Sequence, residues 1–83
     1  MIRFGYHERG KALDGHVIAK VEVLDKDICQ LKCYYNDDCV SYNFGPNETG
    51  GEICELNNST DRQHLKSKEN FIFQETEVGY ICY

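Results

Sequence analysis

Residues 29–54 read CQLKCYYNDDCVSYNFGPNETGGEIC, and the four cysteines in this stretch decide the fold. Cys29 and Cys33 are four residues apart, which places them on one face of a helix. Asp25 is a candidate N-cap residue for that helix. The Asn-Asp-Asp run at residues 36–38 favours turns and caps over helix interiors, so we expect the helix to span residues 26–36.

The four cysteines allow three pairings. Cys29 with Cys33 is poor, because adjacent turns of an intact helix hold the two side chains in unsuitable geometry. Cys33 with Cys39 is natural, since the chain turns back just after the helix, and this leaves Cys29 with Cys54. By loop-closure arithmetic the small ring contributes about 2 kcal/mol and the large ring about 3.5 kcal/mol. We favour this arrangement, and the alternative of Cys29 with Cys39 and Cys33 with Cys54 stays open.

Alternating apolar residues predict strands on both sides of the helix. The expected strands are residues 3–8, 16–23, 40–44 and 52–56, with one or two closing strands at residues 71–73 and 78–81. Gly10-Lys11 and Asp14-Gly15 are turn dipeptides, and residues 45–51 form the polar loop of a hairpin. Residues 57–68 are polar, and we expect them to be irregular. The fold class is therefore α+β.

The chain has 83 residues, five cysteines and a net charge of −5. This length predicts one domain, residues 1–83, whose small core needs disulfides for stability. The acidic balance disfavours nucleic acids and anionic membranes as partners, and no apolar run reaches the ~20 residues of a membrane span. The first residues lack the apolar segment of a secretory signal. An oxidised chain therefore implies that a signal preceded it and was removed, and a cytosolic chain is the alternative.

The polar residues predict neither a metal site nor a catalytic centre. The cysteines lack the second close pair that zinc modules use, and His7, His16 and His64 are scattered among polar or turn residues. The chain contains no C-x-x-C motif, no calcium-binding loop and no motif that joins a nucleophile to a histidine and an acid. We therefore expect a protein without cofactors and without enzymatic activity.

Three segments together resemble the PAN/Apple domain superfamily: CQLKC at residues 29–33, CVSYNF at 39–44 and CELN at 54–57. The family pattern has two helix cysteines four apart, a third that opens an extended aromatic run, and a fourth before an apolar and a polar residue. The segment KALDGHVI at residues 11–18 is similar to PAN modules of invertebrate multidomain extracellular proteins. Gly79-Tyr80 resembles their closing strand.

The resemblance implies one helix packed on a curved antiparallel sheet of about five strands. It also implies disulfides between Cys29 and Cys54 and between Cys33 and Cys39. Cys82 matches the C-terminal member of a third bridge that joins the termini of many Apple domains, but no cysteine lies near Met1. We expect Cys82 to be unpaired or bonded outside this domain, which suggests that the domain belongs to something larger.

Two groups of surface residues are candidates for function. Asn47, Asn57 and Asn58 each begin an N-glycosylation sequon in a predicted loop. Tyr34 and Tyr35 are adjacent on the helix, so their side chains point about 100° apart and one of them is expected to be exposed. An exposed tyrosine is a good contact residue at an interface, which makes the pair a candidate ligand contact.

The expected function is a non-catalytic extracellular module for adhesion or recognition, located in a larger secreted or cell-surface protein. The resemblance implies a protein or glycan ligand. The alternative is a free-standing small secreted effector, such as an inhibitor of a protease or of platelet adhesion. A third, structural role is also open, because Cys82 is placed to link two chains through an interchain disulfide.

Overall fold

The computed structural model describes residues 3–77 and consists there of one helix, five strands and a single 3-10 turn. The strands are β1 (Arg3–Leu13), β2 (Val17–Val23), β3 (Ser41–Pro46), β4 (Glu52–Asn57) and β5 (Leu65–Glu77), the helix is α1 (Lys26–Tyr34), and the 3-10 turn is η1 (Arg62–His64). All five strands form one antiparallel sheet in the order β1-β5-β3-β4-β2. The predicted α+β fold with a single helix on a five-stranded sheet is confirmed.

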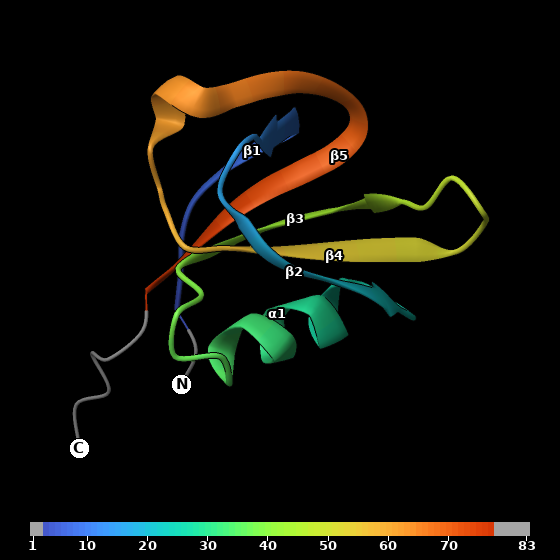
Figure 1. The fold of residues 1–83 in the computed structure, drawn as a ribbon, viewed down its shortest axis with the longest axis horizontal. Coiled ribbons are helices and arrows are strands. Elements are labelled where there is room, and N and C mark those ends of the chain that lie inside the picture. Colours follow the sequence, from blue (N-terminus) through green and yellow to red (C-terminus); the bar gives the residue numbers. More distant parts are fainter. Residues whose placement is uncertain (1–2, 78–83) are drawn as a thin grey trace.

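The helix covers one face of the sheet, where it contacts β2, β3 and β4 (Figure 1). Its N-cap is Asp25, whose side chain accepts a hydrogen bond of 3.0 Å from the backbone N–H of Ile28. The helix ends at Tyr34, two residues before the predicted end. The cause is local, because Asn36 accepts a hydrogen bond of 2.9 Å from the backbone of Asp38 and so closes a turn in place of a helical one.

Between α1 and the sheet lies a core built around the cysteines. Cys29 is bonded to Cys54 and Cys33 to Cys39, with Cα atoms 5.4 and 5.2 Å apart, so the structure contains the pairing that spacing and resemblance favour. The four cysteines pack with buried residues of the strands: Val23, Tyr42 and Leu56. The helix is thus fastened to β4 by one bridge and to the start of the central hairpin by the other.

β1 and β5 pair with each other as a long two-stranded ribbon, and this ribbon bends over the face of the sheet opposite α1 (Figure 1). Between Arg9 and Lys11 the partner in β5 changes from Ile72 to Ser67, so β5 advances five residues while β1 advances two. Gly10 and Asn70 take positive φ angles of 77° and 68° at this irregularity. The surplus residues bend the ribbon.

The pairing of this ribbon corrects two expectations. Strand β1 runs to Leu13 and not to residue 8, because Gly10 occupies a bulge inside a paired ribbon and does not end the strand. Residues 65–68 are in β5 and are not irregular; their polarity reflects a ribbon end that is mostly exposed to solvent. The described part of β5 is one strand that includes residues 71–73, whereas the expected strand at 78–81 lies outside the described residues.

Candidate functional site

The two candidate contact tyrosines lie at the end of α1. Tyr35 is the C-cap residue and its side chain is 77% exposed, whereas Tyr34 is half-buried. The two rings meet edge to face with centroids 5.3 Å apart, which restricts both side chains. Tyr35 is therefore the more accessible of the two candidate contact residues.

Beside Tyr35 the surface is hollowed along α1. This hollow has a volume of about 680 Å³ and is lined by Ile28, Leu31, Lys32, Tyr35, Asn36, Asp37 and Asp38. Leu31 lies two positions from both helix cysteines, so it projects from the side of the helix opposite the core, and it is 44% exposed. The helix hollow therefore combines exposed apolar surface with acidic residues at one end, a composition suited to contact with another protein.

The three sequons lie in different environments. Asn57 is completely buried at the end of β4, so a glycan on it is incompatible with this fold, and this removes Asn57 from the candidate acceptors. Asn58 follows it with an exposed side chain, while its backbone N–H donates a hydrogen bond of 3.1 Å to the carbonyl of His16. Asn47 is half-buried, and its amide nitrogen donates to the carboxylate of Glu22 at 3.0 Å. Asn58 is the most accessible of the three.

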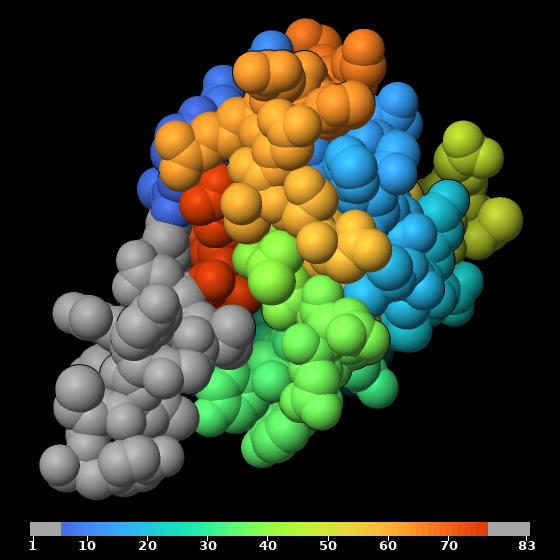
Figure 2. Space-filling model, turned by 60° about the vertical axis from the view of Figure 1, so that its left-hand side comes forward, coloured from blue at the N-terminus to red at the C-terminus, as the bar shows by residue number. Residues whose placement is uncertain are grey.

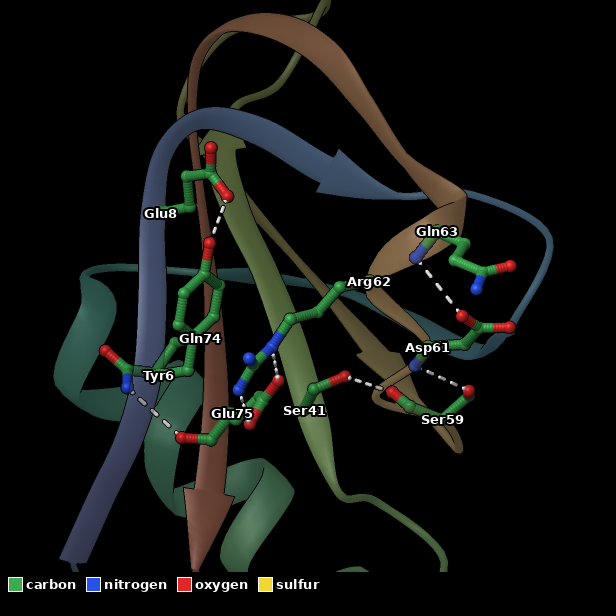
Figure 3. Close-up of polar contacts among 9 residues, drawn as sticks. All are labelled: Tyr6, Glu8, Ser41, Ser59, Asp61, Arg62, Gln63, Gln74 and Glu75. Atoms are coloured by element: carbon green, nitrogen blue, oxygen red, sulfur yellow. Dashed lines mark hydrogen bonds and ion pairs between the residues drawn. The ribbon is translucent and has the colours of Figure 1, made fainter.

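A polar cluster formed by β1, β5 and η1 has no counterpart in the sequence-based expectations (Figure 3). The guanidinium group of Arg62 lies 3.8 Å from the centre of the Tyr6 ring and donates two hydrogen bonds, of 2.9 and 3.2 Å, to the carboxylate of Glu75. Tyr6 donates a hydrogen bond to Glu8, and this bond is the main cause that raises the pKa of Tyr6. Residues 6 and 75 are brought together by the pairing of β1 with β5, and residue 62 reaches them from η1, so no local motif marks the three.

This polar cluster anchors the connection between β4 and β5, which lies alongside the N-terminal strands on the face shown in Figure 2 (orange against blue). Asp61 caps η1 by accepting a hydrogen bond of 3.1 Å from the backbone of Gln63. Ser41 in β3 donates a hydrogen bond of 2.7 Å to the carbonyl of Ser59. The cluster therefore has a clear structural role in holding η1 against the sheet.

On the face of the sheet opposite α1, a second hollow lies under the bend of the β1–β5 ribbon. It has a volume of about 460 Å³ and is lined by Ala12, Leu13, Asp14, Gly15, Val17, Lys20, Glu55, Lys66, Ser67 and Lys68. Asn43 forms a pair of hydrogen bonds with the backbone of Leu13, at 2.8 and 3.0 Å, and so fixes the end of β1 to the central strand. Glu55 is the buried carboxylate of this hollow, with only 7% of the residue exposed.

Of the histidines weighed for metal binding, the structure brings His16 and His64 together and leaves His7 apart from them. In residues 3–77 no group of three or more histidine, cysteine, aspartate or glutamate side chains is arranged to hold a metal ion. The rings of His16 and His64 meet edge to face with centroids 5.1 Å apart, and His64 lies 3.4 Å from the carboxylate of Asp61, whereas His7 lies exposed on β1. None of the helices in that part of the chain is long and apolar enough to cross a membrane.

Comparison with known protein families gives one finding. The sequence model of the PAN domain matches residues 7–80, which is most of the chain. Neither the curated proteins nor the solved structures contain a significant match. Cys82 lies outside both the matched segment and the described residues.

Proposed function

The chain belongs to the PAN domain family, and from this premise we propose that it is a non-catalytic recognition module of a larger secreted or cell-surface protein. PAN domains generally bind proteins or carbohydrates and are not catalytic. Two intrachain disulfides and the family together point to an extracellular location. The biological role that we propose for this module is adhesion.

The main observation behind the proposal is that disulfides fix the inner side of α1 while its outer side is exposed. Cys29 and Cys33 are completely buried and fasten the inner side of the helix to β4 and to the start of β3, so the helix has little freedom to move. Leu31 and Tyr35 lie on its outer side, exposed, beside a hollow of about 680 Å³. A contact surface held rigid before binding loses little conformational entropy when a partner binds.

Binding measurements on the oxidised domain test this proposal. We expect saturable binding to at least one member of a panel of purified extracellular matrix proteins or of a glycan array, measured by surface plasmon resonance and by fluorescence. For a protein ligand, Tyr35→Ala is expected to weaken binding about tenfold or more, as at an interface hot spot. Glu69→Ala, at an exposed position of β5 away from α1, is the control and leaves binding unchanged.

Two results count against the proposal. Absence of any saturable ligand on both the panel and the array contradicts a recognition role. A bound protein whose affinity is the same for the wild type, for Tyr35→Ala and for Glu69→Ala places the contact surface somewhere other than the helix hollow.

A further inference from the structure

The sheet face opposite α1 contains a charged groove. Side chains of β3 and β4 alternate, so Tyr42 and Cys54 point to the helix while Asn43 and Glu55 point to the other face. The hollow under the ribbon adjoins a smaller one of about 260 Å³, because both are lined by Lys20, Glu55 and Lys68. We call the two together the lysine groove.

The buried carboxylate of the lysine groove is held in a fixed orientation. The amide nitrogen of Asn43 donates a hydrogen bond of 3.1 Å to Oε1 of Glu55, and Nζ of Lys20 lies 3.7 Å from its Oε2. A carboxylate has about four acceptor positions, so each oxygen keeps capacity for a further donor. Burial of a carboxylate is costly, and the side chain of Glu55 is only 9% exposed. Glu55 lines both hollows of the groove, where a ligand can use its remaining acceptor capacity.

Three lysines line the groove with this carboxylate, although the chain as a whole has a net charge of −5. The two hollows together have three lysines, Lys20, Lys66 and Lys68, and three acids, Asp14, Glu48 and Glu55, so the groove is balanced in charge. Lys20 is paired with Glu55, whereas Lys66 forms no ion pair with any described residue. Nζ of Lys68 lies 4.1 Å from the centre of the Phe71 ring, which keeps this ammonium group at the groove.

The groove thus offers acceptors for hydroxyl groups beside cations for negative groups. We infer that it binds an acidic saccharide, whose hydroxyls donate to Glu55 and whose carboxylate or sulfate groups lie against Lys66 and Lys68. An inorganic anion supplies only the second kind of contact, and a neutral sugar only the first. The larger hollow, at about 460 Å³, is within the range of about 300–1,000 Å³ of small-molecule sites. This inference rests on the proposed recognition function and gives it a ligand class and a surface.

Calorimetric titration of the oxidised, unglycosylated domain with oligosaccharides tests the inference. Hyaluronan fragments carry carboxylates alone and heparin fragments carry sulfates as well, so the two titrations distinguish the sources of negative charge. We expect binding to at least one of them, weakened tenfold or more in Lys66→Ala/Lys68→Ala. The matched control is Arg9→Ala/Lys26→Ala, which removes the same charge outside the groove and changes affinity less than twofold.

A second variant separates a ligand contact from a structural role of Glu55. Glu55→Gln keeps the shape of the side chain and an oxygen that accepts from Asn43, so the fold is expected to remain, as circular dichroism can show. Because an amide oxygen accepts more weakly than a carboxylate, binding weakens if saccharide hydroxyls donate to Glu55. If Glu55 only repels the anionic ligand, Glu55→Gln binds the oligosaccharide more tightly than the wild type does. In that case the proposed hydrogen bonds from saccharide hydroxyls to Glu55 are wrong.

The outcomes also separate this inference from the proposed function. If neither oligosaccharide binds, or if both double variants weaken binding equally, the lysine groove is not the site of an acidic saccharide. Binding of a matrix protein that depends on Tyr35 still supports recognition in that case. Loss of both kinds of binding counts against both proposals.

Discussion

Gly45 in β3 is predicted to be intolerant of even one added methyl group. A Cβ atom at this position lies 2.5 Å from Cδ1 and Cγ of Phe71 and 2.7 Å from Cε1. Carbon atoms in contact are ordinarily about 3.5–4.0 Å apart, so the overlap is about 1 Å along one side of the ring. Phe71 is 5% exposed, and Lys68 lies over its ring, so the ring has little room to move away.

The cost of Gly45→Ala follows from this overlap. Gly45 is not among the glycines with a positive φ, so alanine brings no backbone strain and the penalty is steric. Overpacking of this kind costs about 1–3 kcal/mol. For a domain of this size about 1 kcal/mol lowers Tm by about 4–8 °C, so we expect Tm to fall by about 5–20 °C.

Thermal unfolding of the oxidised domain, followed by calorimetry and circular dichroism, measures the effect. A double-mutant cycle with Phe71→Leu identifies its cause, because a smaller side chain relieves the overlap and the two costs become less than additive. Gly50→Ala is the comparison for backbone strain, since that glycine has a φ of 101° and open space around it. If Gly45→Ala changes Tm by less than about 2 °C, or if the cycle is additive, the steric reasoning is refuted.

Three further predictions concern the disulfides, a buried tyrosine and the sequons. Replacing Cys29 and Cys54 by alanine is expected to lower the free energy of unfolding by about 3.5 kcal/mol, and replacing Cys33 and Cys39 is expected to lower it by about 2 kcal/mol. The difference arises because the two disulfides close loops of 25 and 6 residues, which differ in closure entropy. Urea titrations that give the reverse order contradict this prediction. Burial raises the pKa of Tyr42 to about 12, so the stabilising effect of its neutral form is complete below pH ~10 and is lost as the pH rises through 12. Tyr42→Phe lacks this contribution, and identical pH profiles of unfolding for both proteins speak against it. In a secretory host, glycopeptide mass spectrometry is expected to find glycan on Asn58 and none on Asn57, and an occupied Asn57 in folded protein is incompatible with its burial.

The features that local sequence predicts well are those whose cause is local. The start of α1 depends on Asp25 and on cysteines four residues apart, and strands β2 and β4 follow alternating patterns only 6 or 7 residues long. The PAN-like cysteine pattern additionally predicts how the helix and strands are joined into one fold. Element type and approximate position were predictable here because each signal lies within one element.

The ribbon and the lysine groove depend on pairing between distant residues. Gly10 indicates a turn in sequence, yet it lies with Asn70 at a bulge that continues a paired ribbon. Glu55 has the sequence context of an exposed strand residue, and only the contact with Asn43 shows that it is a fixed, buried acceptor. Such a site has no motif, because its parts come from β2, β3, β4 and β5.

The bend in the ribbon and the charge of the groove are parts of one arrangement. The surplus residues of β5 opposite Gly10 fold its first part, with Lys66 and Lys68, over the buried Glu55. The same bend directs Phe71 against Gly45, and the ring of Phe71 in turn lies under Lys68. A side chain at Gly45 therefore displaces a wall of the lysine groove as well as the core. Stability and saccharide binding are accordingly expected to respond together at Gly45, but separately at Lys66, whose exposed side chain contributes charge without packing.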